Sequence, residues 1–258
     1  MSTRVIHIAR NTFREAVRDR VLYNLVFFAL LMVGAAVLFG QISIGIERIV
    51  LVNLGLTAMS VFGALIAVFI GIGLVSKEID KRTLYTVLAH PVRRWEFILG
   101  KFCGLAGTLV VNTTLMAVGF FVALLYVART LTTGDWPVVV AIYFIILQLV
   151  ILTAIALLFS SFSSPILSAV LTFALFVIGV FAQDLREFAA MAKGSVHWIA
   201  TATAYLVPNF ASFNVISSSA HGQAIPLAMV GFNSLYALTY CAASIAGAIV
   251  IFEYRNLK

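Results

Sequence analysis

Six stretches of the chain are apolar over about the length that a helix needs to cross a lipid bilayer, roughly 20 residues. None contains Asp, Glu, Lys or Arg before its terminal residues. With 62% hydrophobic and 10% charged residues, the chain is too apolar for a soluble domain, which carries about 25% charged residues. We therefore predict an all-α integral membrane protein in which residues 1–258 form one domain with six transmembrane helices. The predicted spans are Val21–Gly40, Ile49–Val75, Phe102–Ala128, Pro137–Ser160, Ile166–Ala182 and Leu227–Phe252.

Lys and Arg residues are distributed unevenly among the segments that join these spans. If both chain ends lie in the cytoplasm, thirteen of the 17 Lys and Arg residues fall on the cytoplasmic side and four fall outside. Membrane proteins concentrate Lys and Arg in their cytoplasmic segments, and this bias sets their orientation. We therefore predict that both termini are cytoplasmic. The net charge of +7 then reflects membrane orientation and does not indicate nucleic-acid binding.

The N-terminal segment, residues 2–20, has the pattern of an amphipathic helix. At 100° per residue its apolar residues, among them Val5 and Phe13, fall on one face. We predict a helix that lies in the cytoplasmic interface, with its basic face toward anionic lipid headgroups. The alternative is an unstructured basic tail that only sets orientation. The basic face carries Arg4, Arg10, Arg14 and Arg18.

The count of Lys and Arg residues places residues 183–226 on the side of the membrane opposite the cytoplasm, but their sequence is not that of a polar loop. The apolar stretch VHWIATATAYLVPNF has only 15 residues, of which 12 precede its proline, and this is too short for a crossing. We predict re-entrant or interfacial helices that are shielded by protein, because bare backbone is not tolerated in lipid. Trp198 and Tyr205 suit the headgroup level, and Pro208 and Asn209 end the apolar stretch.

The sequence has no signature of a catalytic or ion-coupling centre. No Asp, Glu, Lys or Arg lies in the middle of a span, where ion relays usually need one. The chain has no GxxxxGK[ST] phosphate loop and no HExxH motif. Cys103 and Cys241 lie inside apolar runs, as small core residues do. We therefore predict no catalytic residue, no metal site and no cofactor bound by this chain.

Charged residues of both signs gather in residues 77–101, between the second and third spans. The middle of this segment, Thr83–His90, reads as a short helix with Leu84, Val87 and Leu88 on one face. Apolar residues among charges of both signs are typical of a docking surface, whereas the alternative is a solvated positive-inside loop. The residues predicted to dock are Glu78, Asp80, Arg82, Thr83, Leu84, Tyr85, Val87, Leu88, Pro91, Arg93 and Arg94.

This segment resembles a loop in the permease subunits of type-2 ABC exporters, the group related to the nitrous-oxide-reductase maturation permease. Those proteins carry Glu, three residues, Gly-Thr, then Leu-Leu, Pro and an aromatic residue before Leu-Gly-Lys. Arg82 stands here where glycine is usual. The resemblance covers nearly the whole chain, including SSFSSPILSAVLTF at 160–173 and YLVPNF at 205–210. The matching loop residues are Glu78, Thr83, Leu84, Leu88, Pro91, Arg93, Arg94, Phe97, Leu99, Gly100 and Lys101.

The resemblance implies a permease that works as a homodimer or related heterodimer in the bacterial plasma (inner) membrane. Each copy would rest on a separate cytoplasmic ATP-binding subunit, so that ATP and Mg²⁺ bind to two copies of that partner and not to this chain. Thr83–His90 would be the coupling helix, and the second and fifth spans would line the transport path. The remaining alternatives are a membrane scaffold for a peripheral partner and an integral membrane lipid-modifying enzyme.

Overall fold

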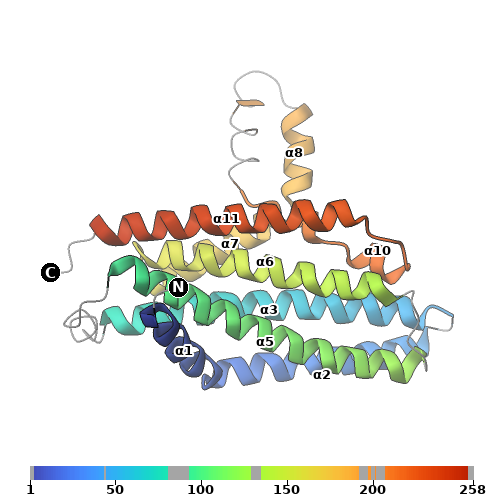
Figure 1. The fold of residues 1–258 in the computed structure, drawn as a ribbon. Helices are drawn as coiled ribbons and strands as arrows, with labels where there is room; N and C mark the ends of the chain where they lie inside the picture. The colour runs from blue at the N-terminus through green and yellow to red at the C-terminus, as the bar shows by residue number, and fades with distance from the viewer. Residues whose placement is uncertain are drawn as a thin grey trace.

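The computed structural model describes residues 3–43, 45–80, 93–128, 135–191, 197–198, 201 and 207–254. Every regular element in these ranges is a helix, and the long helices run side by side in one bundle (Figure 1). This confirms an all-helical protein with at least five of the predicted spans. The five helices that are long and apolar enough to cross a membrane are α2 (Arg20–Ile42), α3 (Glu47–Asp80), α5 (Arg94–Ala128), α6 (Trp136–Ser160) and α11 (Leu227–Tyr254).

The predicted fifth span, Ile166–Ala182, differs from the structure at its C-terminal end. Helix α7 covers Pro165–Val180, and helix α8 (Ala182–Met191) leaves it at an angle of 64° and projects from the bundle (Figure 1). The 16 residues of α7 are about 24 Å long, short of the roughly 30 Å hydrocarbon core. A sixth crossing is therefore complete only if the bent pair counts as one span. The sequence shows where the apolar run ends, near Ala182, but hydropathy does not show that the helix changes direction there.

Helix α6 is the centre of the bundle. In the apolar part of α6, 72% of the residues are buried, against 28% in the apolar part of α2. Helices α3, α7 and α11 pack against α6, and α2 packs on α3 and α5 (Figure 1). Because lipid tails are as apolar as leucine, helix association in a bilayer depends on close packing more than on hydrophobic burial. The bundle is therefore organised around the helix with the largest buried fraction.

Helix α1 (Thr3–Val17) packs across the beginning of α5. A Cβ atom on Gly100 would lie 2.6 Å from the Ile8 side chain, and one on Gly104 would lie 2.6 Å from the carbonyl oxygen of Ala9. The two backbones therefore approach closely at this pair of glycines. The buried face of α1 at this contact carries Val5, Thr12 and Ala16.

The opposite face of α1 is basic. Arg10, Arg14 and Arg18 are exposed, and Nη1 of the exposed Arg4 lies 4.0 Å from Oε2 of the buried Glu96 on α5. Residues 3–17 thus form a helix with one packed face and one basic face. The location of this basic face among lipid headgroups stays a prediction.

The two described ends of the chain lie at the same end of the bundle (Figure 1). The last turn of α3 and the first turn of α5 lie at that same end, which is the arrangement that the predicted topology requires. At the opposite end, Arg48 of α3 donates to Asp135 Oδ1 (2.7 Å) and to the carbonyl oxygen of Ala220 (3.1 Å). These contacts fasten α3, the start of α6 and helix α10 (Ile216–Ala220) to one another.

We predict that Gly104→Ala destabilises the protein by about 1–3 kcal/mol, because the added methyl group overpacks the contact between α1 and α5. Its Cβ would also lie 2.7 Å from the Cβ of Thr12. Gly34→Ala is the matched control, since a Cβ there meets nothing within 4 Å. Thermal unfolding in detergent should show a lower midpoint for Gly104→Ala only. Equal midpoints for both variants would contradict a close contact at Gly104.

Candidate functional site

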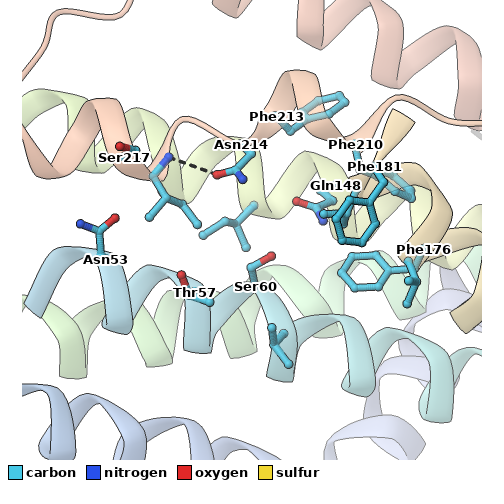
Figure 2. Close-up of a pocket in the computed structure, with 15 residues that line it drawn as sticks. Asn53, Thr57, Ser60, Gln148, Phe176, Phe181, Phe210, Phe213, Asn214 and Ser217 are labelled. Atoms are coloured by element: carbon cyan, nitrogen blue, oxygen red, sulfur yellow. Dashed lines mark hydrogen bonds between the residues drawn. The ribbon is translucent and has the colours of Figure 1, made fainter. Parts of the chain in front are cut away.

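A cavity of about 380 Å³ lies between α3, α6, α7 and the 3-10 turn η2 (Phe210–Phe213) (Figure 2). Small-molecule sites in proteins typically have volumes of about 300–1,000 Å³. The cavity is therefore large enough for a ligand. The residues that line it are Asn53, Thr57, Ser60, Val61, Ile145, Gln148, Phe176, Val177, Val180, Phe181, Phe210, Phe213, Asn214, Ile216 and Ser217.

One wall of the cavity is polar. Asn53, Thr57 and Ser60 occupy positions i, i+4 and i+7 of α3 and share one face of that helix, and Gln148 of α6 also lines the cavity (Figure 2). Thr57 lies about 15 Å along α3 from Glu47, and Gln148 lies about 18 Å along α6 from its N-terminus. These side chains are therefore inside the spans and not at their ends.

The hydrogen bonding of this polar wall is incomplete. Gln148 is 5% exposed, and its amide makes no hydrogen bond with any residue that the structure describes. The hydroxyls of Thr57 and Ser60 also have no partner among those residues. Thr153, which lies farther along α6, donates instead to the carbonyl oxygen of Leu149 at 2.9 Å. The cavity thus holds polar groups that the described part of the chain leaves without partners.

The other wall is aromatic and includes the turn η2. The Phe213 ring centroid lies 5.9 Å from that of Phe144 on α6, and the Phe210 centroid lies 5.8 Å from that of Phe176 on α7. Phe210 and Phe213 are 1% and 2% exposed, so the turn is inserted into the bundle. Gly179 on α7 permits this insertion, because a Cβ there would lie 2.5 Å from the Phe210 ring.

Helix α11 satisfies two polar groups of this inserted segment. The backbone N–H of Asn209 donates to the Tyr236 hydroxyl oxygen (2.9 Å), and the Asn233 amide donates to the carbonyl oxygen of Ser212 (2.8 Å). Tyr236 lies about 14 Å along α11 from Leu227. Irregular backbone at membrane depth is tolerated only where protein or a water-filled cavity surrounds it. The re-entrant assignment of residues 183–226 stays a prediction.

The four residues predicted for this segment lie in different environments. Pro208 is buried and Asn209 is half-buried beside α11, whereas Trp198 is 76% exposed. His197 Nδ1 lies 2.8 Å from the carbonyl oxygen of Ala189, which places the half-buried His197 and its neighbour Trp198 beside α8. Tyr205 lies outside the described residues. The headgroup-level position of Trp198 stays a prediction.

Residues 6–257 match the family model described as "ABC-2 family transporter protein". The chain belongs to the ABC-2 transporter family. No curated protein matches the chain. The chain is thus a multi-pass transmembrane subunit of an ABC transporter. Subunits of this family are generally non-catalytic and work with an ATP-binding partner. Its placement in the nitrous-oxide-reductase maturation group stays a prediction.

The structure describes four of the ABC-2 protein's predicted docking residues. The backbone of Glu78 and Asp80 forms the last turn of α3, Arg93 directly precedes α5, and Arg94 is its first residue. The N–H of Arg93 donates to Glu96 Oε2 (3.1 Å), as in a helix N-terminal capping box. The other predicted docking residues lie outside the described ranges: Arg82, Thr83, Leu84, Tyr85, Val87, Leu88 and Pro91.

Arg94 has a structural role within the chain. Its Nη1 donates to the carbonyl oxygens of Phe252 (2.7 Å) and Glu253 (2.9 Å), and its guanidinium carbon lies 5.9 Å from the Phe252 ring centroid. These carbonyls lie in the last turn of α11, where a cation is favourable for the helix dipole. The predicted contact of Arg94 with a partner stays a prediction.

The cavity was not predicted from the sequence as a set of residues. A signal was present, because Asn53, Thr57 and Ser60 recur at helical spacing inside an apolar run. The opposing Gln148 has no such pattern around it. Only the packing of α3 against α6 and α7 shows that these side chains line the same space.

We predict that Arg94→Met lowers the free energy of unfolding by about 1.5–3 kcal/mol per charged hydrogen bond lost. Methionine keeps part of the packing on Phe252 but cannot donate to the α11 carbonyls. Arg93→Met is the matched control, because the Arg93 side chain is exposed. Chemical unfolding of the purified variants in detergent measures the difference. A loss for Arg93→Met as large as that for Arg94→Met would contradict this role.

Proposed function

We propose that the chain is the permease subunit of an ATP-driven exporter in the bacterial inner membrane. Two copies, or two related chains, form the transport path, and each rests on a cytoplasmic ATP-binding subunit. The observation that carries the proposal is the ABC-2 family match over residues 6–257 of a chain without a GxxxxGK[ST] phosphate loop. Such a chain needs a partner to hydrolyse ATP.

The proposed coupling element is the segment between α3 and α5, with the Thr83–His90 helix seated in a cleft of the ATPase. The contacts of α5 support this proposal. The first turns of α5 contact α1 through Gly100 and Gly104, and they contact the end of α11 through Arg94. A displacement of the coupling segment would therefore move α1, α5 and α11 together.

The proposed transport path passes the cavity between α3, α6 and α7. The helices that form its walls include the second and fifth spans, which the family resemblance assigns to the path. The polar face of α3 supports this proposal, because polar side chains inside a span usually face protein or a water-filled space.

We predict that Leu88→Asp abolishes coupling without unfolding the protein. The carboxylate would be desolvated in the ATPase cleft at a cost of about 3 kcal/mol or more, which weakens association by at least roughly 100-fold. The readouts are co-purification of the ATP-binding subunit and its ATPase rate. Thr86→Asp is the control on another face of the same predicted helix, and it should retain both. Wild-type behaviour of Leu88→Asp would refute the coupling assignment.

The topology gives a separate prediction. In a variant with Cys103 and Cys241 replaced, a cysteine at the exposed Gln223 should react with an impermeant maleimide in intact cells. A cysteine at Lys81 should react only after permeabilisation, and one at Lys193 should behave like Gln223. Labelling of Lys81 in intact cells would contradict the orientation. Opposite behaviour of Lys193 and Gln223 would show that the segment between them crosses the membrane.

A further inference from the structure

The cavity between α3, α6 and α7 combines two chemically different walls (Figure 2). Hydroxyl and amide groups of Asn53, Thr57 and Ser60 on α3 form one, and phenylalanine rings form the other, with the Gln148 amide of α6 beside these rings. Small-molecule sites usually have this composition, in which apolar surface supplies contact area and a few polar groups fix orientation. The two walls therefore suit a ligand with a polar end and an apolar body.

The polar groups of the cavity call for a hydrogen-bonding occupant. Gln148 is 95% buried at membrane depth and has no hydrogen-bond partner among the described residues. Leaving such a group unpaired in an apolar environment is unfavourable, and this explains why most buried polar groups are paired. Thr57 and Ser60 line the same cavity and also have no described partner. An amide and two hydroxyls are thus available to one ligand head group.

The described residues that line the cavity are uncharged. Of the fifteen residues that line it in the described structure, none is Asp, Glu, Lys, Arg or His. Transfer of an ion into such a site is costly, because no opposite charge offsets the loss of hydration. The arrangement therefore favours an uncharged head group over a cationic or anionic one.

We propose that this cavity binds an uncharged amphipathic molecule. Its hydroxyl-bearing head lies against Thr57, Ser60 and Gln148, and its hydrocarbon body lies against Phe176, Phe181 and Phe210. This assignment rests on the proposed function, because it makes this molecule class the cargo of the exporter. It deepens that function by excluding ions and charged lipids from the site.

The experiment uses the full chain in nanodiscs with three photoreactive probes that share one diazirine-bearing acyl chain. The head groups are glycerol, sulfate and trimethylammonium. Cross-links are located by mass spectrometry at residues 53–61 and 145–148, and their saturation gives an apparent Kd for each probe. The glycerol probe should label these segments, with an apparent Kd at least about tenfold lower than those of the charged probes. Equal labelling by all three probes would overturn the proposal.

Two variants test the polar wall. Thr57→Val and Gln148→Leu should each weaken labelling by the glycerol probe about two- to tenfold, the usual effect of losing one neutral hydrogen bond. Thr153→Val is the matched control, because the Thr153 hydroxyl already donates to Leu149. It should leave the apparent Kd unchanged. Thr57 is exposed and valine has the same shape, so this variant keeps the test valid even if Gln148→Leu fails to fold.

The outcomes separate this inference from the proposed function. A chain that co-purifies with its ATPase but shows no head-group selectivity overturns the ligand class alone. A chain that selects the glycerol probe but neither binds nor stimulates an ATPase overturns the exporter role and leaves the binding site standing. Wild-type labelling of both Thr57→Val and Gln148→Leu would also refute the site, whatever the ATPase result.

Discussion

The packing of α3, α7 and α11 around α6 is the interaction on which the rest of the structure depends. A bilayer supplies no hydrophobic force between helices, so they associate through close side-chain contact and through hydrogen bonds within the protein. Helix α6 is the most buried span, and it supplies Phe144 to the inserted turn and Gln148 to the cavity. The same helix therefore holds the bundle together and forms part of the candidate site. Substitutions on its buried faces should change both properties at once.

The five long spans were predictable because lipid imposes one strong rule: a crossing segment must be apolar and long. The rule says nothing about helix direction, so the sequence did not reveal the 64° bend after Val180. It also says nothing about partners. Gly100 and Gly104 lie four residues apart in the sequence, but only the structure shows that α1 packs on them. The cavity was missed for the same reason, because the sequence does not show that Gln148 lines the same space as residues of α3 and α7.

The structure gives two neighbouring arginines different environments. Arg93 is exposed, whereas Arg94 ties the beginning of α5 to the last carbonyls of α11. A charge count treats the two as equivalent, because it registers only the side of the membrane. Hydrogen-bond geometry separates them, and it shows that positive charge at this end of the bundle also serves internal architecture. A basic residue at this end of the bundle can therefore favour the cytoplasmic side of the membrane and also bind specific groups within the protein.

The shortness of α7 has a consequence for how the protein responds to its membrane. Helix α6, which packs against α7, has 25 residues, whereas α7 has 16, so the apolar surface is thinner at α7 than at α6. Hydrophobic mismatch of this kind is relieved by tilting a helix or by thinning the bilayer around it. Phe176, Val177 and Val180 of α7 line the cavity, so an adjustment of α7 alters the cavity's shape. The acyl-chain length of the surrounding lipids therefore acts on the shape of the cavity from outside the protein.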